Sequence, residues 1–179
     1  GYQRVCQSFS SMVLKTYFRS PLGVAEMQAD EEKIFSLKFL DDTSTPDDFE
    51  NNDLAKSFPL QNGVRQLQEY FQGQRRHFDL PIRLIGTTFQ QRVWEELTKI
   101  PFGKTITYAQ LATQLGDKKM TRAVASANSM NPLWIIVPCH RVVGSDQTLV
   151  GYAGGLWRKE WLLKHEQRFA EKPSQGKLF

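Results

Sequence analysis

The chain has 179 residues, 40% of them hydrophobic and 23% charged, with a formal net charge of +4. This length can bury a sizeable core in one domain or in two small ones. No apolar run is long enough to span a membrane, and no signal-peptide pattern opens the sequence. We therefore expect an intracellular protein with no membrane partner, cytoplasmic if the source is bacterial and nuclear if it is eukaryotic.

The charge is divided unevenly along the chain. Residues 1–85 contain 10 Lys and Arg against 12 Asp and Glu, a net charge of −2, whereas residues 86–179 contain 13 against 7, a net charge of +6. A cationic half suits a polyanionic partner such as DNA. An ordinary solvated surface explains a charge of this size equally well.

The two cysteines, Cys6 and Cys139, show neither a CxxC motif nor another metal-ligand spacing. We therefore expect no metal and no cofactor. In the absence of a secretory signal, reduced thiols are more probable than a disulfide between them.

The first half predicts a small α+β unit. Strand-like segments lie at residues 12–18, 24–29 and 34–40, separated by the turns 20–23 and 30–33. An acidic loop follows over 41–53. Apolar residues at helical spacing then predict a helix over 59–72, ended by Gly73, and residues 77–85 are extended. The boundary between an N-terminal domain (1–86) and a C-terminal domain (87–179) is placed at Gly86-Thr87.

The second half predicts mostly helices. Thr88 and Gln91 have capping-box spacing and begin a helix that ends before Pro101. Thr107 and Gln110 form a second capping box, which begins a helix running through Leu115.

A turn at Gly116-Asp117 follows, and Asp117 can cap a third helix running to about Ser129. Two short helices joined by a tight turn that contains glycine are a helix-turn-helix candidate. A last amphipathic helix is expected over 156–168, with Leu156, Trp157, Trp161 and Leu162 as its apolar residues.

The segment from Ile135 to Val143 carries the most chemical information. Its apolar start predicts a strand that ends at Pro138, because proline cannot donate to a β-ladder. Cys139 follows, and such a thiol is either an inert core cysteine or a positioned nucleophile. His140 and Arg141 come directly after it, and burying them without a function would be costly. Their presence favours the nucleophile.

The sequence Pro138-Cys139-His140-Arg141-Val142 resembles the active-site signature of the O6-alkylguanine-DNA alkyltransferases, and the resemblance covers about residues 88–168. Before Gly86 it is weak. Other motifs fit the family in order: 101–103, 107–108, Ala112, 122–124, 131–132, 151–155 and 159–166. The resemblance implies a ribonuclease-H-like N-terminal domain of sheet and helix, followed by a mostly helical domain with a helix-turn-helix.

The resemblance also implies a DNA repair function. Such a protein is expected to bind double-stranded DNA through the minor groove as a monomer, and to flip O6-alkylguanine, and also O4-alkylthymine, out of the duplex. It then transfers the alkyl group irreversibly to its own cysteine, here Cys139, without a cofactor. The implied DNA-binding residues are Thr121, Arg122, Ala123, Ala127 and Tyr108; Arg122 fills the space of the flipped base, and Tyr108 pushes the nucleotide outward.

The implied catalytic residues are Cys139, His140, Glu166 and Asn131. His140 acts as a base through a bridging water, Glu166 orients it, and Asn131 connects the helix-turn-helix to the cysteine segment. The implied substrate-binding residues are Tyr108, Val142, Tyr152, Ala153 and Gly154. Some family members bind zinc near the N-terminus, but Cys6 has no second cysteine beside it.

Three other interpretations stay open. A lesion sensor would share the fold without repairing DNA, but such relatives lack the cysteine. A cysteine hydrolase would use Cys139, His140 and Glu166, but it would need turnover and would not need a helix-turn-helix. A sequence-specific regulator is disfavoured, because the proposed recognition helix is rich in alanine and poor in side chains that read base edges.

Overall fold

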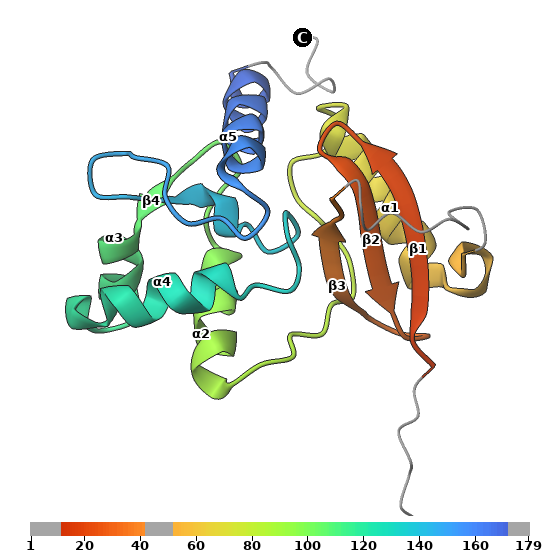
Figure 1. Cartoon of the computed structure of the whole chain (residues 1–179), viewed down its shortest axis with the longest axis horizontal. Helices are drawn as coiled ribbons and strands as arrows, with labels where there is room; N and C mark the ends of the chain where they lie inside the picture. Colours follow the sequence, from red (N-terminus) through yellow and green to blue (C-terminus); the bar gives the residue numbers. More distant parts are fainter. Residues whose placement is uncertain (1–11, 42–51, 172–179) are drawn as a thin grey trace, which may run out of the picture.

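The computed structural model describes residues 12–41 and 52–171, so Cys6 and most of the acidic loop lie outside the described residues. The described chain forms two units side by side (Figure 1). The first is a three-stranded sheet with one helix, and the second is mainly helical. This confirms the predicted α+β class. No helix among the described residues is long and apolar enough to cross a membrane.

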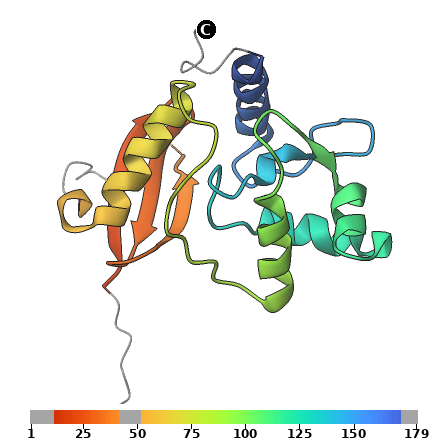
Figure 2. The ribbon, with the colours of Figure 1, turned by 180° about the vertical axis from the view of Figure 1, so that it is seen from behind.

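The N-terminal sheet is antiparallel, in the order β1 (Leu14–Ser20), β2 (Gly23–Ala29) and β3 (Ile34–Phe39). The helix α1 (Phe58–Phe71) follows a short 3-10 turn, η2 (Leu54–Lys56), and lies against one face of the sheet (Figure 2). Ser57 begins α1 by accepting a hydrogen bond from the Leu60 amide at 3.3 Å. The predicted strands and helix are therefore confirmed to within about two residues at each end.

The edge of β3 joins the two units. Its Ile34 exchanges backbone hydrogen bonds with residues 81 and 83 of the extended connector, at 2.9 and 2.8 Å. Further along the strand, the Leu37 amide donates to the Pro132 carbonyl at 2.9 Å, and the Trp134 amide donates to the Leu37 carbonyl at 3.1 Å. The segment that leads to Cys139 is thus hydrogen-bonded to the N-terminal sheet.

The predicted start of the first C-terminal helix is wrong by one residue. In α2 (Thr88–Leu97) the N-cap is Thr87, whose extended backbone lets its hydroxyl accept from the Gln90 amide at 3.1 Å. Thr88 is already helical and cannot act as the cap. Gln91 instead donates to the carbonyls of Leu84 and Gly86.

The helix-turn-helix is present, with one difference in detail. The capping box of Thr107 and Gln110 begins α3 (Tyr108–Gln114), as predicted. Asp117 does not cap the next α-helix but a single 3-10 turn, η3 (Lys118–Met120), by accepting from the Lys119 amide at 2.9 Å. The helix α4 (Thr121–Ser129) follows directly.

The predicted strand before Cys139 is wrong. Residues 135 and 136 form a turn, and Ile135 has a φ of +70°. Ile135 and Val137 belong to the core and Ile136 packs against it, so burial and not strand pairing accounts for the apolar run. Only the two-residue strand β5 (Val142–Val143) follows, and it pairs in parallel with β4 (Ile106–Thr107).

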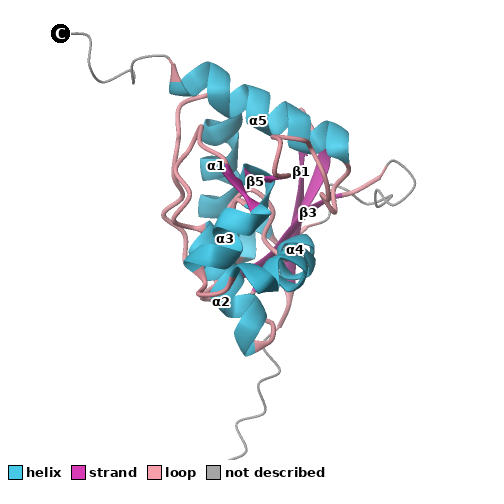
Figure 3. Ribbon diagram, turned by 90° about the vertical axis from the view of Figure 1, so that its left-hand side faces the viewer, coloured by secondary structure: helices cyan, strands magenta, loops and turns pink. Residues whose placement is uncertain are grey.

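The last helix, α5 (Leu156–Ala170), differs from the prediction in which face it buries. Leu156 and Trp157 are 49% and 54% exposed, so they do not belong to its buried face. That face instead contains Arg158, Lys159, Leu162, His165 and Glu166. In Figures 1 and 3, α5 and α2 lie at opposite ends of the helical unit. In Figure 1, α5 lies on the side of this unit that faces the N-terminal unit. A helix that buries four polar or charged side chains must supply partners for them.

Candidate active site and nucleic-acid interface

Cys139 is held by its backbone in the protein interior. It begins the 3-10 turn η4 (Cys139–Arg141), which links Pro138 to β5, and it is 4% exposed. Its amide donates to the Val137 carbonyl at 2.8 Å, and its carbonyl accepts from Asn128 Nδ2 of α4 at 3.3 Å. The helix-turn-helix therefore contacts the cysteine directly.

The Cys139 thiol is protonated at neutral pH in the resting protein. Burial raises its pKa to about 11, although the Asn131 side chain and the positive charge of Lys159 both act to lower it. Alkylation requires the thiolate. The site therefore needs a base that takes the thiol proton.

Asn131 fixes the loop that carries Cys139. Its Nδ2 donates to the Val137 carbonyl at 2.8 Å and to the Leu133 carbonyl at 3.3 Å, while its Oδ1 accepts from the Leu133 amide at 3.0 Å. The side chain thus closes the turn from residue 131 to 137. As predicted, Asn131 lies between α4 and the cysteine segment.

His140 and Glu166 form the predicted pair. His140 Nε2 lies 2.7 Å from Glu166 Oε2, and both side chains are almost fully buried. Burial acts to raise the pKa of Glu166, but His140 and Arg141 outweigh it and hold that pKa well below its ordinary value. Burial lowers the pKa of His140, with Glu166 opposing it. His140 is thus a neutral imidazole that donates from Nε2 to a carboxylate.

That tautomer leaves His140 Nδ1 as a hydrogen-bond acceptor. Nδ1 is buried and makes no hydrogen bond to any residue that the structure describes. An acceptor nitrogen of the kind that can take up a proton therefore lies on the residue after Cys139.

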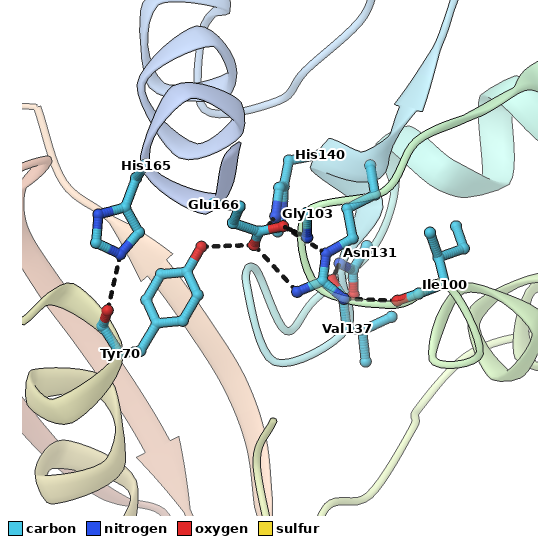
Figure 4. Close-up of polar contacts among 9 residues, drawn as sticks. Tyr70, Ile100, Gly103, Asn131, Val137, His140, His165 and Glu166 are labelled. Atoms are coloured by element: carbon cyan, nitrogen blue, oxygen red, sulfur yellow. Dashed lines mark hydrogen bonds and ion pairs between the residues drawn. The ribbon is translucent and has the colours of Figure 1, made fainter. Parts of the chain in front are cut away.

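Arg141 anchors the same carboxylate. Its Nε donates to Glu166 Oε1 at 2.8 Å and one terminal nitrogen donates to Oε2 at 3.0 Å, the two-pronged geometry that favours arginine over lysine. The other terminal nitrogen donates to the Ile100 carbonyl at 2.6 Å. Figure 4 shows this network around Glu166.

Two aromatic residues with predicted roles lie near the thiol. Tyr108, the first residue of α3, donates to the carbonyls of Val150 and Gly151 at 3.0 and 3.3 Å. Burial, and then the nearby Cys139, raise the pKa of Tyr108; the same two causes raise the pKa of Tyr152. The Tyr152 hydroxyl is buried and makes no hydrogen bond to a described residue.

The three other predicted substrate-binding residues differ in exposure. Val142 is fully buried, and Ala153 is exposed. Gly154 allows a close approach, because a Cβ there would lie 2.8 Å from the Tyr152 ring and 2.9 Å from the Trp134 ring.

Lys159 is a polar residue of this site to which the sequence analysis gave no role. It is fully buried, its Nζ donates to the Val150 carbonyl at 2.8 Å, and it lies 3.5 Å from the Tyr108 hydroxyl. Burial lowers its pKa to about 8, with Cys139 opposing. The available signal was its helical spacing, because Lys159 lies three residues before Leu162 and six before His165, on the buried face of α5.

The outer face of α4 carries some of the predicted DNA-binding residues. Arg122 and Ala123 are exposed, and Thr121 is partly exposed. Ala127 is 4% exposed and its carbonyl accepts from Trp94 Nε1 at 2.9 Å, so the structure places this residue in the core. Asn128 is also buried, and its side chain points inward to the Cys139 carbonyl. Val124, Ala127 and Asn128 recur at helical spacing, which identifies the inner face.

Fold and site together define a protein in which a helix-turn-helix contacts a buried cysteine, and this cysteine is followed by a histidine that is hydrogen-bonded to a buried glutamate. Family models agree with this class: "6-O-methylguanine DNA methyltransferase, ribonuclease-like domain" matches residues 13–84, and "6-O-methylguanine DNA methyltransferase, DNA binding domain" matches residues 88–168. The chain belongs to the 6-O-methylguanine DNA methyltransferase family.

Individual relatives support the assignment. A methylated-DNA–protein-cysteine methyltransferase of Methanosarcina acetivorans is 42% identical over 83% of this chain and 95% of its own length. The constitutive enzyme of that name from Bacillus subtilis is 39% identical over 88% and 96%. The crystal structure of Mycobacterium tuberculosis O6-methylguanine methyltransferase has a TM-score of 0.79 at 38% identity, covering 94% of this chain and 99% of its own. A structure of the M. tuberculosis protein in complex with DNA has a TM-score of 0.76 at 39% identity, covering 87% and 93%.

Proposed function

We propose that this protein is a DNA repair methyltransferase that transfers an alkyl group from DNA to Cys139. The observation that carries the proposal is the buried Cys139 thiol, followed directly by His140, whose Nε2 is bound to Glu166 at 2.7 Å. The names of the relatives agree with it, and none of those reported above is named as a lesion sensor or a hydrolase.

The chemistry has two balanced changes. The thiol proton passes to His140 Nδ1 through a bridging water, and the thiolate sulfur attacks the alkyl carbon. A sulfur–carbon bond forms as the carbon–oxygen bond to the base breaks, and the restored base, which stays in the DNA, takes up one proton in place of the one that the thiol gave to His140. The product is a thioether, which has no easy leaving group, so each molecule acts once.

The proposed substrate is O6-alkylguanine, and also O4-alkylthymine, in duplex DNA. A buried thiol cannot reach a stacked base, so the nucleotide must rotate out of the helix. We place Tyr152, Val142, Ala153 and Gly154 around the extruded base. We assign Tyr108 the role of pushing the nucleotide outward.

The proposed DNA contact is the outer face of α4 in the minor groove. Arg122 and Ala123 are exposed there, and small side chains permit close approach to a narrow groove. Arg122 would occupy the space left by the flipped base. We further propose that the protein acts as a monomer inside the cell, and that its two domains meet at residues 86 and 87.

The direct test is the intact mass of the protein after incubation with duplex DNA containing O6-methylguanine. We expect one addition of about 14 Da, located on Cys139 by peptide mapping, and no turnover beyond one equivalent. Repeated release of product would favour a hydrolase. Binding to the lesion without an adduct would favour a sensor.

A further inference from the structure

Tyr70 of α1 reaches from the N-terminal unit into the site around Glu166. Its hydroxyl lies 2.7 Å from Glu166 Oε2, although the two residues are 96 positions apart. The ring is fully buried. Figure 4 shows the side chain pointing from its own helix toward the carboxylate of α5. In this contact the hydroxyl must be the donor, because the partner is an ionised carboxylate and burial raises the pKa of the phenol well above its ordinary value.

Glu166 receives five hydrogen bonds from the residues that the structure describes. Its Oε2 accepts from Tyr70, from His140 at 2.7 Å and from Arg141 at 3.0 Å. Its Oε1 accepts from Arg141 at 2.8 Å and from the Gly103 amide at 3.3 Å. A carboxylate offers about four lone-pair positions, so this one is saturated. Tyr70 and His140 thus donate hydrogen bonds to the same carboxylate oxygen, and each weakens the interaction of that oxygen with the other.

Surrounding rings fix the Tyr70 side chain independently of its hydroxyl. Ring centroids of Phe78 and Phe102 lie 5.6 and 6.0 Å from its own, and that of His165 lies at 5.1 Å. The Tyr70 carbonyl also lies 2.8 Å from His165 Nε2. A phenylalanine at this position would therefore keep the shape of the site and remove one donor.

We propose that Tyr70 is a positioning residue for alkyl transfer, whose hydroxyl holds the Glu166 carboxylate and moderates the negative charge that Glu166 presents to His140. The inference rests on the proposed function, in which His140 is the base. It assigns the N-terminal unit a part in the chemistry, beyond supporting the fold. Tyr70 acts through Glu166 and touches neither the thiol nor the substrate.

The proposal fixes the direction of a pH effect. With one donor fewer, Oε2 is more negative toward His140, so the protonated imidazole is stabilised and the pKa of His140 rises. The other groups that act on His140 are Lys159 and His165 of α5, together with Arg141 in its own segment. None of these is altered by Tyr70→Phe, so the shift reports on the hydroxyl.

The test compares the full-length parent with Tyr70→Phe. Single-turnover reaction with free O6-benzylguanine, which needs no base flipping, is measured from about pH 5 to 9. We expect the midpoint of the acid limb to rise by roughly 0.3 to 1 pH unit, the shift that one hydrogen bond can produce. Tyr17→Phe removes a hydroxyl from β1 of the same unit and should leave the midpoint unchanged.

A second variant serves if Tyr70→Phe does not fold. Incorporation of 3-fluorotyrosine at position 70 keeps the hydroxyl and makes it a stronger donor, so the midpoint should move in the opposite direction. In a Glu166→Gln background, neither change at position 70 should move it, because the shared charge is gone. The proposal would be overturned if Tyr70→Phe folded and the midpoint of its acid limb were unshifted. It would also be overturned if Tyr70→Phe shifted this midpoint in the Glu166→Gln background.

A histidine titration separates this inference from the function on which it rests. The pKa of His140 followed by NMR in the unreacted protein should be higher in Tyr70→Phe than in the parent. This measurement needs no alkyl transfer. Parent protein that forms no adduct on Cys139 would refute the proposed function, whereas an unchanged His140 titration would refute the role of Tyr70.

Discussion

Asn128 of α4 donates from Nδ2 to the carbonyl oxygen of Cys139 at 3.3 Å. The same helix exposes Arg122 on its outer face. One short helix therefore holds the backbone of the nucleophile on one side and presents the proposed DNA contact on the other. This arrangement predicts that binding and chemistry can be separated by substitutions on the two faces of α4 and on the cysteine itself.

Cys139→Ser should abolish alkyl transfer while leaving the affinity for duplex DNA within a few-fold of the parent. Serine is close in size and the thiol lies in the interior, away from the exposed face of α4. The adduct is measured by intact mass, and binding by fluorescence anisotropy. Methyl transfer that persists in Cys139→Ala would remove the basis of the proposed function.

Arg122→Ala should slow repair of duplex DNA by roughly 10- to 100-fold, because loss of a plug that offsets unstacking costs on the order of 1–3 kcal/mol. Reaction with free O6-benzylguanine, which requires no extrusion, should continue at close to the parent rate. His140→Ala should slow both reactions, since it acts on the thiol.

Lys119→Ala is the matched control for Arg122→Ala, because Lys119 is an exposed cation in η3, beside α4. It should weaken duplex binding slightly and leave repair at saturating DNA unchanged. If Arg122→Ala slowed both substrates equally, Arg122 would be supporting the pocket or the fold, and its assignment as a minor-groove plug would be withdrawn.

Binding to undamaged duplex DNA should depend strongly on salt and weakly on sequence. Residues 86–179 carry a net charge of +6, and the exposed side chains at the start of α4 are small apart from Arg122. The logarithm of affinity should fall against the logarithm of salt concentration with a slope of about −0.9 for each phosphate neutralised. A flat salt dependence, or marked preference for one undamaged sequence, would contradict this.

Arg141→Met should destabilise the fold by about 3–5 kcal/mol, because it leaves the buried Glu166 carboxylate without its two-pronged partner. Arg141→Lys should cost less, since the charge is kept but the paired geometry is lost. Urea unfolding measures both. Lys164→Met removes an exposed ion pair with Glu160 on the same helix and should cost less than about 1 kcal/mol. If Arg141→Met lowered the free energy of unfolding by less than about 1 kcal/mol, the Glu166 network would contribute little to stability.

Burial of the Cys139 thiol should make the parent lose stability at alkaline pH relative to Cys139→Ala. The pKa of the thiol rises from 9.0 to about 11 on folding, so the unfolded chain releases this proton first. The contribution of the protonated thiol to the free energy of unfolding is complete below pH 9.0 and is lost as the pH rises toward 11, a total of about 3 kcal/mol.

Both proteins keep Lys159, whose pKa is lowered on folding to about 8, so comparing them removes the part of its opposite contribution that comes from burial. The free energy of unfolding of each is measured by denaturant titration at several pH values. A difference between them that stays constant from neutral to alkaline pH would show that the thiol is not desolvated as the structure indicates.

The sequence by itself determined the local elements and the reactive residue. Apolar residues at helical spacing predicted α1, and the capping box of Thr107 and Gln110 fixed the start of α3, because these signals act within one or two turns of chain. The polar pair that follows Cys139 marked it as a nucleophile, because such groups are not buried without partners. The motif also predicted the bond between His140 and Glu166 through its resemblance to a known family.

Tertiary contacts decided what local patterns could not. The run at 135–137 resembles a strand in composition, yet residues 135 and 136 form a turn that packs into the core, and Ile135 takes a positive φ. In α5, Leu156 and Trp157 are exposed although they are apolar. Glu166 is buried although it is charged, because donors from distant segments form hydrogen bonds with its carboxylate. One of these donors, Tyr70, lies 96 residues away, so its partner is set by how α1 and α5 meet. Packing between helices so far apart in the sequence depends on the complete fold, so local sequence patterns cannot predict it.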